Sequence, residues 1–115
     1  MLYVFYHHIY EFQKGLRNLV LCTEKAVERE KIEARLQKEN ISYLIHEIAG
    51  NKINVYFGNE ACINVVKSFN NPKLNEISDE QDFILGIMLG YDRLQQCERY
   101  LNRLGQKHHI EELIG

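Results

Sequence analysis

The chain has 115 residues, of which 45% are hydrophobic and 26% are charged. This length fits a single domain, residues 1–115, and this composition can bury a core without disulfides or a metal. The 14 basic and 16 acidic side chains give a formal net charge of -2 with no basic stripe, so nucleic acid is not an expected partner.

The first expected element is a helix that ends at Gly15. Its apolar residues recur at steps of three and four, which places them on one helical face: Leu2, Phe5, Ile9, Phe12 and Leu16. A second stripe beside them consists of Tyr3, Tyr6 and Tyr10. The β-branched and aromatic content leaves a strand open as an alternative for the first few residues.

A strand and a surface helix are expected next. Residues 17–23 predict a strand, because residues 19–22 are all apolar and would face both sides of a sheet. Thr23 is expected to cap a helix over residues 24–39. Among its many charges this helix has only a narrow apolar stripe, formed by Ala26, Ile32 and Leu36.

Two alternating runs, residues 42–49 and 52–57, flank Gly50-Asn51 and predict a β-hairpin. If that pair forms a two-residue turn, three cross-strand pairs share one face and one pair lies on the other. On the first face Ile48 is opposite Ile53, His46 opposite Val55, and Leu44 opposite Phe57; on the second, Ile45 pairs with Tyr56.

Two more helices complete the chain. Asn59 is expected to cap a short helix over residues 60–69. Ser78, followed by several carboxylates, predicts the start of a helix that runs to Leu104 and is stopped by Gly105. Along it a heptad seam recurs at steps of four and three: Phe83, Ile87, Gly90, Leu94, Cys97, Leu101 and Leu104.

This order of elements predicts an α+β fold with a three-stranded, mostly antiparallel sheet. Its βαββα core is similar to a ferredoxin-like unit without the last strand. An N-terminal helix and a long C-terminal helix flank that core. The longest apolar run after the start, residues 83–91, is far shorter than the roughly 20 residues that span a bilayer, so no membrane segment is expected.

Cys22, Cys62 and Cys97 are odd in number and lack any C-x-x-C spacing. They therefore predict reduced thiols in a cytoplasmic protein rather than disulfides or a zinc site. The N-terminal segment has neither the basic lead-in nor the cleavage site of a secretory signal, which agrees with that location. No basic cluster beside a cysteine would lower a thiol pKa.

Two segments place a histidine pair before a glutamate at helical spacing. In the first segment His7 and His8 precede Glu11. In the second, His108 and His109 precede Glu112. Two ligands do not complete a metal site, so solvated histidines and no bound metal are expected. The residues that could line a ligand site are His7, His8, Tyr10, Glu11, Asp92 and Arg93.

His46 lies on the core-facing side of the expected hairpin register. No serine or cysteine nucleophile can be identified beside it, so it is interpreted as a core histidine. Gly86 and Gly90 each cost about 1 kcal/mol relative to alanine inside a helix, which close approach of a second helix could offset. A phosphate loop is disfavoured, because the Lys-Ser/Thr end of that motif is missing.

Three segments together resemble a small bacterial family of uncharacterised proteins of about this length. They are residues 7–12 (HHIYEF), 14–21 (KGLRNLVL) and 86–93 (GIMLGYDR). The resemblance covers nearly the whole chain and implies a three-stranded sheet with several helices, in a protein proposed to dimerise. It also implies a link to low-potential electron transfer, because members are often encoded near flavodoxin. No activity and no functional residues come with it.

The leading hypothesis is a homodimeric, non-enzymatic interaction or regulatory module without a cofactor, with flavodoxin as a second expected partner. The alternative is a small-molecule or metal-binding protein, or a minor enzyme, that uses the His- and Tyr-rich first helix. A helix that is apolar all round cannot bury every side against its own sheet. The expected dimer interface therefore consists of Phe83, Gly86, Ile87, Gly90, Tyr91 and Leu94.

Overall fold

A computed structural model describes residues 2–70 and 73–114, and the surroundings of side chains as far as residue 106. In chain order the elements are α1 (Tyr3–Gln13), β1 (Leu19–Lys25), the 3-10 turn η1 (Ala26–Glu28), α2 (Arg29–Lys38), β2 (Ser42–Ile48), β3 (Lys52–Gly58), α3 (Glu60–Ser68), the 3-10 turn η2 (Leu74–Glu76), α4 (Asp79–Met88) and α5 (Arg93–Ile114). The α+β class, the N-terminal helix and the long C-terminal helix are confirmed.

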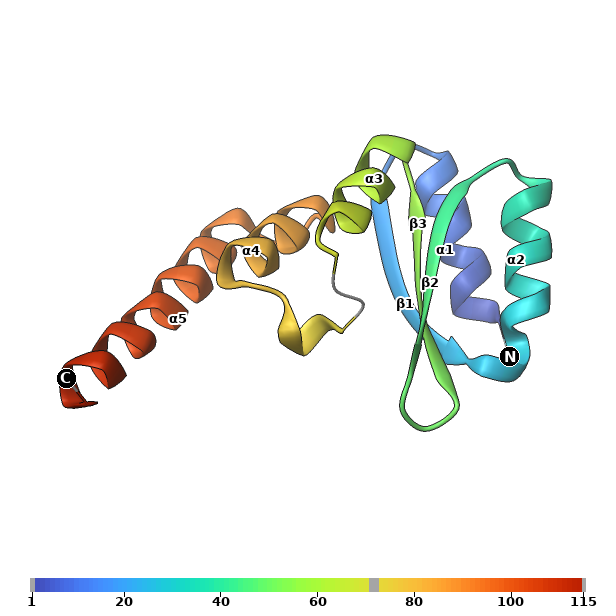
Figure 1. Ribbon diagram of the computed structural model, residues 1–115. Coiled ribbons are helices and arrows are strands. Elements are labelled where there is room, and N and C mark those ends of the chain that lie inside the picture. Colours follow the sequence, from blue (N-terminus) through green and yellow to red (C-terminus); the bar gives the residue numbers. More distant parts are fainter. Residues whose placement is uncertain (1, 71–72, 115) are drawn as a thin grey trace.

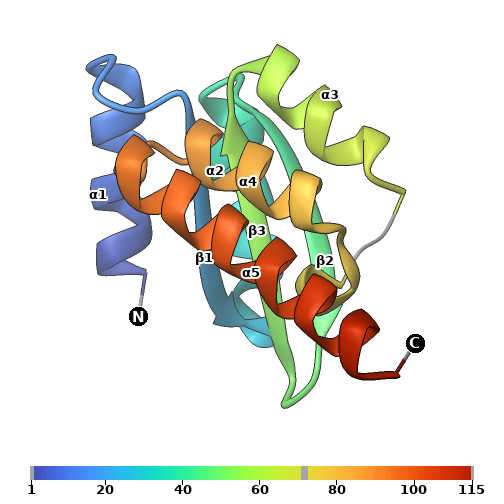
Figure 2. The same cartoon turned by 90° about the vertical axis from the view of Figure 1, so that its left-hand side faces the viewer.

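The strands form one antiparallel sheet in the order β1-β3-β2. Helices α1 and α2 cover one face of the sheet, and α3 and α4 cover the other (Figure 1). Helix α5 lies beside α4 and extends away from the sheet (Figure 1), and the turned view in Figure 2 shows it crossing in front of the sheet. This extra layer gives the molecule its elongated shape, 54 × 31 × 24 Å.

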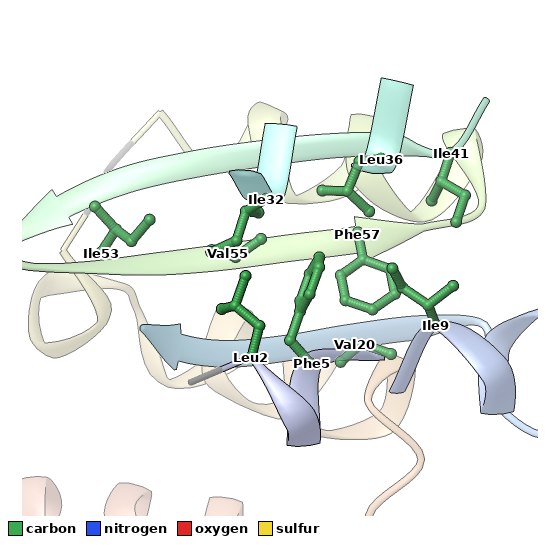
Figure 3. Close-up of a cluster of buried hydrophobic side chains, with 10 residues drawn as sticks. All are labelled: Leu2, Phe5, Ile9, Val20, Ile32, Leu36, Ile41, Ile53, Val55 and Phe57. Atoms are coloured by element: carbon green, nitrogen blue, oxygen red, sulfur yellow. The ribbon is translucent and has the colours of Figure 1, made fainter. Parts of the chain in front are cut away.

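The larger of two apolar clusters fills the space between the sheet and helices α1 and α2 (Figure 3). It contains Leu2, Phe5, Ile9, Val20, Ile32, Leu36, Ile41, Ile53, Val55 and Phe57. The rings of Phe5 and Phe57 meet edge to face at 5.6 Å. Burying each large side chain contributes about 1.5–3 kcal/mol, so this cluster anchors α1 on the sheet.

The expected helical face of α1 is confirmed except at its end. Leu2, Phe5 and Ile9 are buried, whereas Leu16 is 70% exposed. Gly15 adopts a left-handed conformation, with φ of +77°, and turns the chain away from the helix axis. Leu16 therefore lies in the loop that leads to β1 and does not share the helical face.

The second apolar cluster lies on the opposite face of the sheet, under α3 and α4. Its buried residues are Leu19, Tyr56, Ile63, Val66, Ile77, Leu85 and Leu89. Burial raises the pKa of Tyr56 to about 12, so its hydroxyl stays neutral at physiological pH.

The predicted hairpin register is wrong by one residue. The strands pair Ile48 with Lys52 and His46 with Asn54. Residues 49–51 form the loop, and both Gly50 (φ +77°) and Asn51 (φ +54°) have left-handed conformations. A shift of one residue exchanges the two faces, and this sheet has apolar residues on both faces, so the apolar pattern did not select the register.

In the observed register the remaining predicted pairs change partners too. Ile45 pairs with Val55 and Leu44 with Tyr56, while Phe57 faces Tyr43. His46 is consequently on the face that carries Tyr56, with the two rings edge to face at 5.7 Å.

The second helix starts later than predicted, because β1 continues to Lys25. Thr23 does not cap a helix: its hydroxyl donates a 2.7 Å hydrogen bond to Oδ1 of the buried Asn54 on the neighbouring strand. Thr23 therefore bonds to the neighbouring strand and does not start the helix. Ile32 and Leu36 of the predicted stripe are buried as expected.

The helix expected over residues 78–104 begins as predicted but breaks in the middle. Ser78 forms a capping box, in which its Oγ accepts from the Gln81 N–H and its own N–H donates to the Gln81 side chain, both at 3.0 Å. Gly90, with φ of +82°, ends α4, and Asp92 Oδ2 accepts from the Gln95 N–H at 2.9 Å to start α5. The expected continuous heptad seam is therefore wrong.

The two halves of that predicted helix fold back on each other instead. Phe83 of α4 stacks on Tyr100 of α5, with ring centroids 5.4 Å apart. Gly105 does not stop the second half, since α5 continues to Ile114. Within the described part of the chain, no helix combines the length and apolar content needed to cross a membrane.

Candidate functional site

Helix α5 is held to α4 by charged side chains. Arg99 donates two hydrogen bonds to Asp82, from Nε at 2.9 Å and from Nη2 at 3.1 Å. Arg103 bridges two carboxylates, with Nε 2.8 Å from Asp79 Oδ1 and Nη1 3.0 Å from Asp82 Oδ1. The hydrogen bonds from Arg99, joined by both guanidinium charges, hold the pKa of Asp82 below its usual range although partial burial opposes this.

Several apolar side chains of α5 are exposed to solvent. Leu94 is 66% and Leu101 63% exposed, and Cys97 between them is exposed too. Their steps of three and four place them in one stripe of the helix. An apolar stripe in solvent on a helix anchored by its polar side is the reverse of the usual arrangement.

This stripe is continuous with exposed apolar residues of α4. Cys97 is one turn from Tyr100, and the Tyr100 ring stacks on Phe83, which is one turn from Ile87. The surface, here called the hairpin face, consists of Phe83, Ile84, Ile87, Tyr91, Leu94, Cys97, Tyr100 and Leu101. None of these side chains is charged.

Four of the predicted interface residues, Phe83, Ile87, Tyr91 and Leu94, lie on the hairpin face. The two glycines do not. Gly86 is buried against α5 of its own chain, where a Cβ atom would collide with the Gln96 side chain, and Gly90 forms the break between the helices. Ile84 and Tyr100 were missed, since a single straight helix puts them outside the heptad seam.

A groove of about 550 Å³, here called the arginine groove, lies between the end of α1 and the turn that joins α4 to α5. It is lined by Glu11, by residues 16–18, by residues 87–91 and by Arg93. These residues come from the three segments on which the family resemblance rests. The fold thus brings into one place segments that are up to about 80 residues apart in the sequence.

Residues 3–103 match the family described as Protein of unknown function (DUF2023). The chain belongs to this family. The expected membership of an uncharacterised family is thereby confirmed. A comparison with curated proteins found no match.

In this DUF2023 protein, Arg17 connects the arginine groove to the histidines of α1. Its Nη1 is 3.0 Å from Nδ1 of His8 and 4.0 Å from Oε1 of Glu11. The same His8 Nδ1 is 3.2 Å from that Glu11 oxygen. Because an arginine can only donate, Nδ1 either accepts from Arg17 or, when protonated, donates to Glu11.

The six residues predicted to line a ligand site do not all converge. Glu11 and Arg93 line the arginine groove, and His8 contacts it through Arg17. The rings of His7 and Tyr10 stack on each other at 6.4 Å, both exposed to solvent. Asp92 instead caps α5. Arg17 was not predicted as a site residue, because it follows the helix stop without any motif and stands out only as part of the segment 14–21 that carries the family resemblance.

The other predicted candidates are packing or surface residues in the DUF2023 fold. The pKa of the Cys22 thiol is raised to about 12, first by burial and then by the nearby Glu24 carboxylate, whereas Cys97 is exposed. His46 is half-buried against Tyr56. Among the residues the structure describes, no three metal-ligating side chains come together. The predicted pair His108 and His109, with Glu112, lies outside the described side chains.

Proposed function

We propose that this DUF2023 protein is a homodimeric, non-enzymatic interaction module, in which the hairpin face of one copy pairs with the same face of a second. The observation that carries the proposal is the orientation of α5. Arg99 and Arg103 of α5 bind aspartates of α4. Leu94, Cys97 and Leu101 are exposed to solvent. Exposed apolar surface of this kind marks interaction sites in globular proteins.

A second copy fits this face better than a charged partner. In a two-fold symmetric contact the patch of one copy faces the same patch of the other. Side chains of like charge near the symmetry axis would therefore repel each other. The residues that define the hairpin face carry no charge, and Arg99 and Arg103 pair with Asp79 and Asp82 within the chain. One carboxylate borders the face, since Glu80 accepts from the Tyr100 hydroxyl at 2.9 Å. Residues 94, 97 and 101 also have the spacing that pairs two helices.

The test is the oligomeric state of Leu101→Glu, measured by sedimentation equilibrium at micromolar concentration. Leu101 is 63% exposed in the single chain, so the change leaves the fold intact. In the dimer it removes about 1.5–3 kcal/mol of apolar burial per copy and brings two like charges together. We expect dimerisation to weaken by at least about 100-fold.

Val27→Glu is the matched control, because Val27 is 84% exposed on η1 and the charge change is the same. The control should dimerise like the wild type, with circular dichroism confirming that both variants are folded. A monomeric wild type, or a Leu101→Glu variant as dimeric as the control, would show that the proposal is wrong.

We further propose flavodoxin as a redox partner that this module serves, and the support is the family resemblance alone. Redox encounters typically bury little surface, so the complex would be weak and in fast exchange. Titrating the unlabelled protein into ¹⁵N-labelled flavodoxin should shift a localised set of flavodoxin amide signals. Unchanged spectra up to millimolar protein would remove flavodoxin as a partner and leave the dimer proposal untouched.

A further inference from the structure

We infer that the arginine groove is a binding site for the oxyanion group, carboxylate or phosphate, of a small organic molecule held between Arg17 and Arg93. The groove shares Ile87 and Tyr91 with the hairpin face, so it lies at the edge of the proposed dimer contact, whereas Arg17 and Arg93 are outside that face. Arginine is suited to such ligands because its planar guanidinium binds an oxyanion through two parallel N–H donors.

Arg17 is held in place with most of its donors unused. Its side chain is 23% exposed, and its contacts in the described structure, to His8 and Glu11, both involve Nη1. A guanidinium has five N–H donors, so the remaining ones can reach a ligand. Because His8 already fixes the side chain, binding would cost little conformational entropy.

The one carboxylate in the groove only partly compensates Arg17. Glu11 Oε1 is 4.0 Å from Arg17 Nη1, the outer limit of an ion pair, and it is also 3.2 Å from His8 Nδ1 and 3.7 Å from His7 Nε2. A ligand oxyanion could approach Arg17 from the groove while His8 Nδ1 accepts from Arg17 and Glu11 stays beside His7.

Arg93 supplies the second positive charge. It is exposed at the first position of α5, and no carboxylate of the described residues lies within ion-pair distance of it. The N-terminus of α5 is not the anion site, because Asp92 already accepts from the Gln95 N–H there. Two arginines against one glutamate leave the groove with a net positive charge at neutral pH.

The rest of the groove suits the organic part of such a ligand. Its volume of about 550 Å³ is within the usual range of small-molecule sites, roughly 300–1,000 Å³. Leu16, Ile87 and Tyr91 provide exposed apolar walls beside the arginines. A second groove under α5 is slightly larger, about 610 Å³, but its arginines Arg99 and Arg103 are already bound to aspartates.

The test is an NMR titration of the ¹⁵N-labelled full chain with sodium benzoate and, separately, with sodium phosphate, each compared with sodium chloride at the same sodium concentration. We expect saturable shifts of the amides of Asn18, Gly90 and Tyr91 and of the Arg17 Nε–H signal. Saturation by benzoate identifies a carboxylate site and saturation by phosphate identifies a phosphate site; either result supports the inference.

Arg93→Gln should weaken this binding about tenfold, as expected for the loss of a charge-assisted pair of hydrogen bonds. Arg29→Gln is the control with the same charge change, on α2, where Arg29 pairs with Glu33 and Glu47. Shifts no larger than those with chloride, or equal losses in both variants, would overturn the inference. Sedimentation of the same samples reports the dimer independently, so the two proposals can fail separately.

Discussion

The reactivity of each cysteine follows from its surroundings in the fold. The pKa of Cys22, on β1, is raised to about 12 by burial and by the Glu24 carboxylate, so almost no thiolate forms at neutral pH. Cys97 is exposed on α5 of the single chain. From the sequence all three thiols were predicted to be unreactive. In the structure Cys22 and Cys97 differ in their exposure to solvent.

In the Leu101→Glu variant, where the proposed dimer does not cover Cys97, we expect iodoacetamide at pH 8 to alkylate Cys97 and to leave Cys22 unmodified, because only the thiolate reacts. Peptide mass spectrometry at several times of reaction measures the two rates directly. The same reaction in 8 M urea is the control and should modify all three cysteines. Native Cys22 reacting as fast as Cys97 would contradict the buried position of the strand.

Residues whose role is local could be predicted from sequence, and those with a partner far along the chain could not. The helix start at Ser78 and the helix stop at Gly15 depend on neighbours within a few positions, and both were predicted. Thr23 matches a helix cap equally well by local rules, but its hydroxyl is used by Asn54, 31 residues away. Arg17 depends similarly on His8, nine residues before it.

Among the secondary structure elements, the α4–α5 hairpin differs most from its prediction. Glycine is the commonest residue just after a helix end, and aspartate is a favoured cap. Gly90 and Asp92 therefore carry the signal for two helices. The apolar residues nevertheless keep their spacing of three and four across this point, if Gly90 is included as a small residue of the heptad seam. That spacing suggested a single helix.

The attachment of α5 should depend on pH through Asp82. Its pKa in the folded protein is lower than the unfolded value of 3.8, mainly because of the hydrogen bonds from Arg99. A lowered carboxyl pKa stabilises the fold at pH values above the unfolded pKa, and that contribution is lost as the pH falls through the folded pKa. At pH 7 the ion pairs are therefore intact, and they weaken below about pH 4.

We expect Asp82→Asn to lower the free energy of unfolding more at pH 7 than at pH 3, because the contribution of the ion pairs is lost as the pH falls through the lowered pKa of the wild-type carboxyl. Urea unfolding followed by circular dichroism gives both values. Glu30→Gln, at an exposed position of α2, controls for the general effect of removing a carboxylate. The same stability difference at both pH values would show that Asp82 does not act through its charge.

The fold class could be predicted from the order of the apolar patterns along the chain. The two surfaces, the hairpin face and the arginine groove, could not. Helix, strand and hairpin patterns are local, and together they predicted the three-stranded antiparallel sheet. The hairpin face and the arginine groove are both formed by the back-folding of α5 at Gly90. Sequence spacing could name Glu11 and Arg93 as candidates, but it could not show that Arg17 lies with them.

The two sides of α5 respond differently to salt. Raising the ionic strength from 0.1 M to 1 M shortens the Debye length from about 10 Å to about 3 Å, which weakens exposed ion pairs such as Arg99 with Asp82. Apolar contacts do not weaken, and sulfate strengthens them. Concentrated sulfate therefore screens the ion pairs that hold α5 to α4 and strengthens the apolar contact of the proposed dimer. We expect these conditions to favour exchange of α5 between two copies, with the left-handed turn at Gly90 as the hinge.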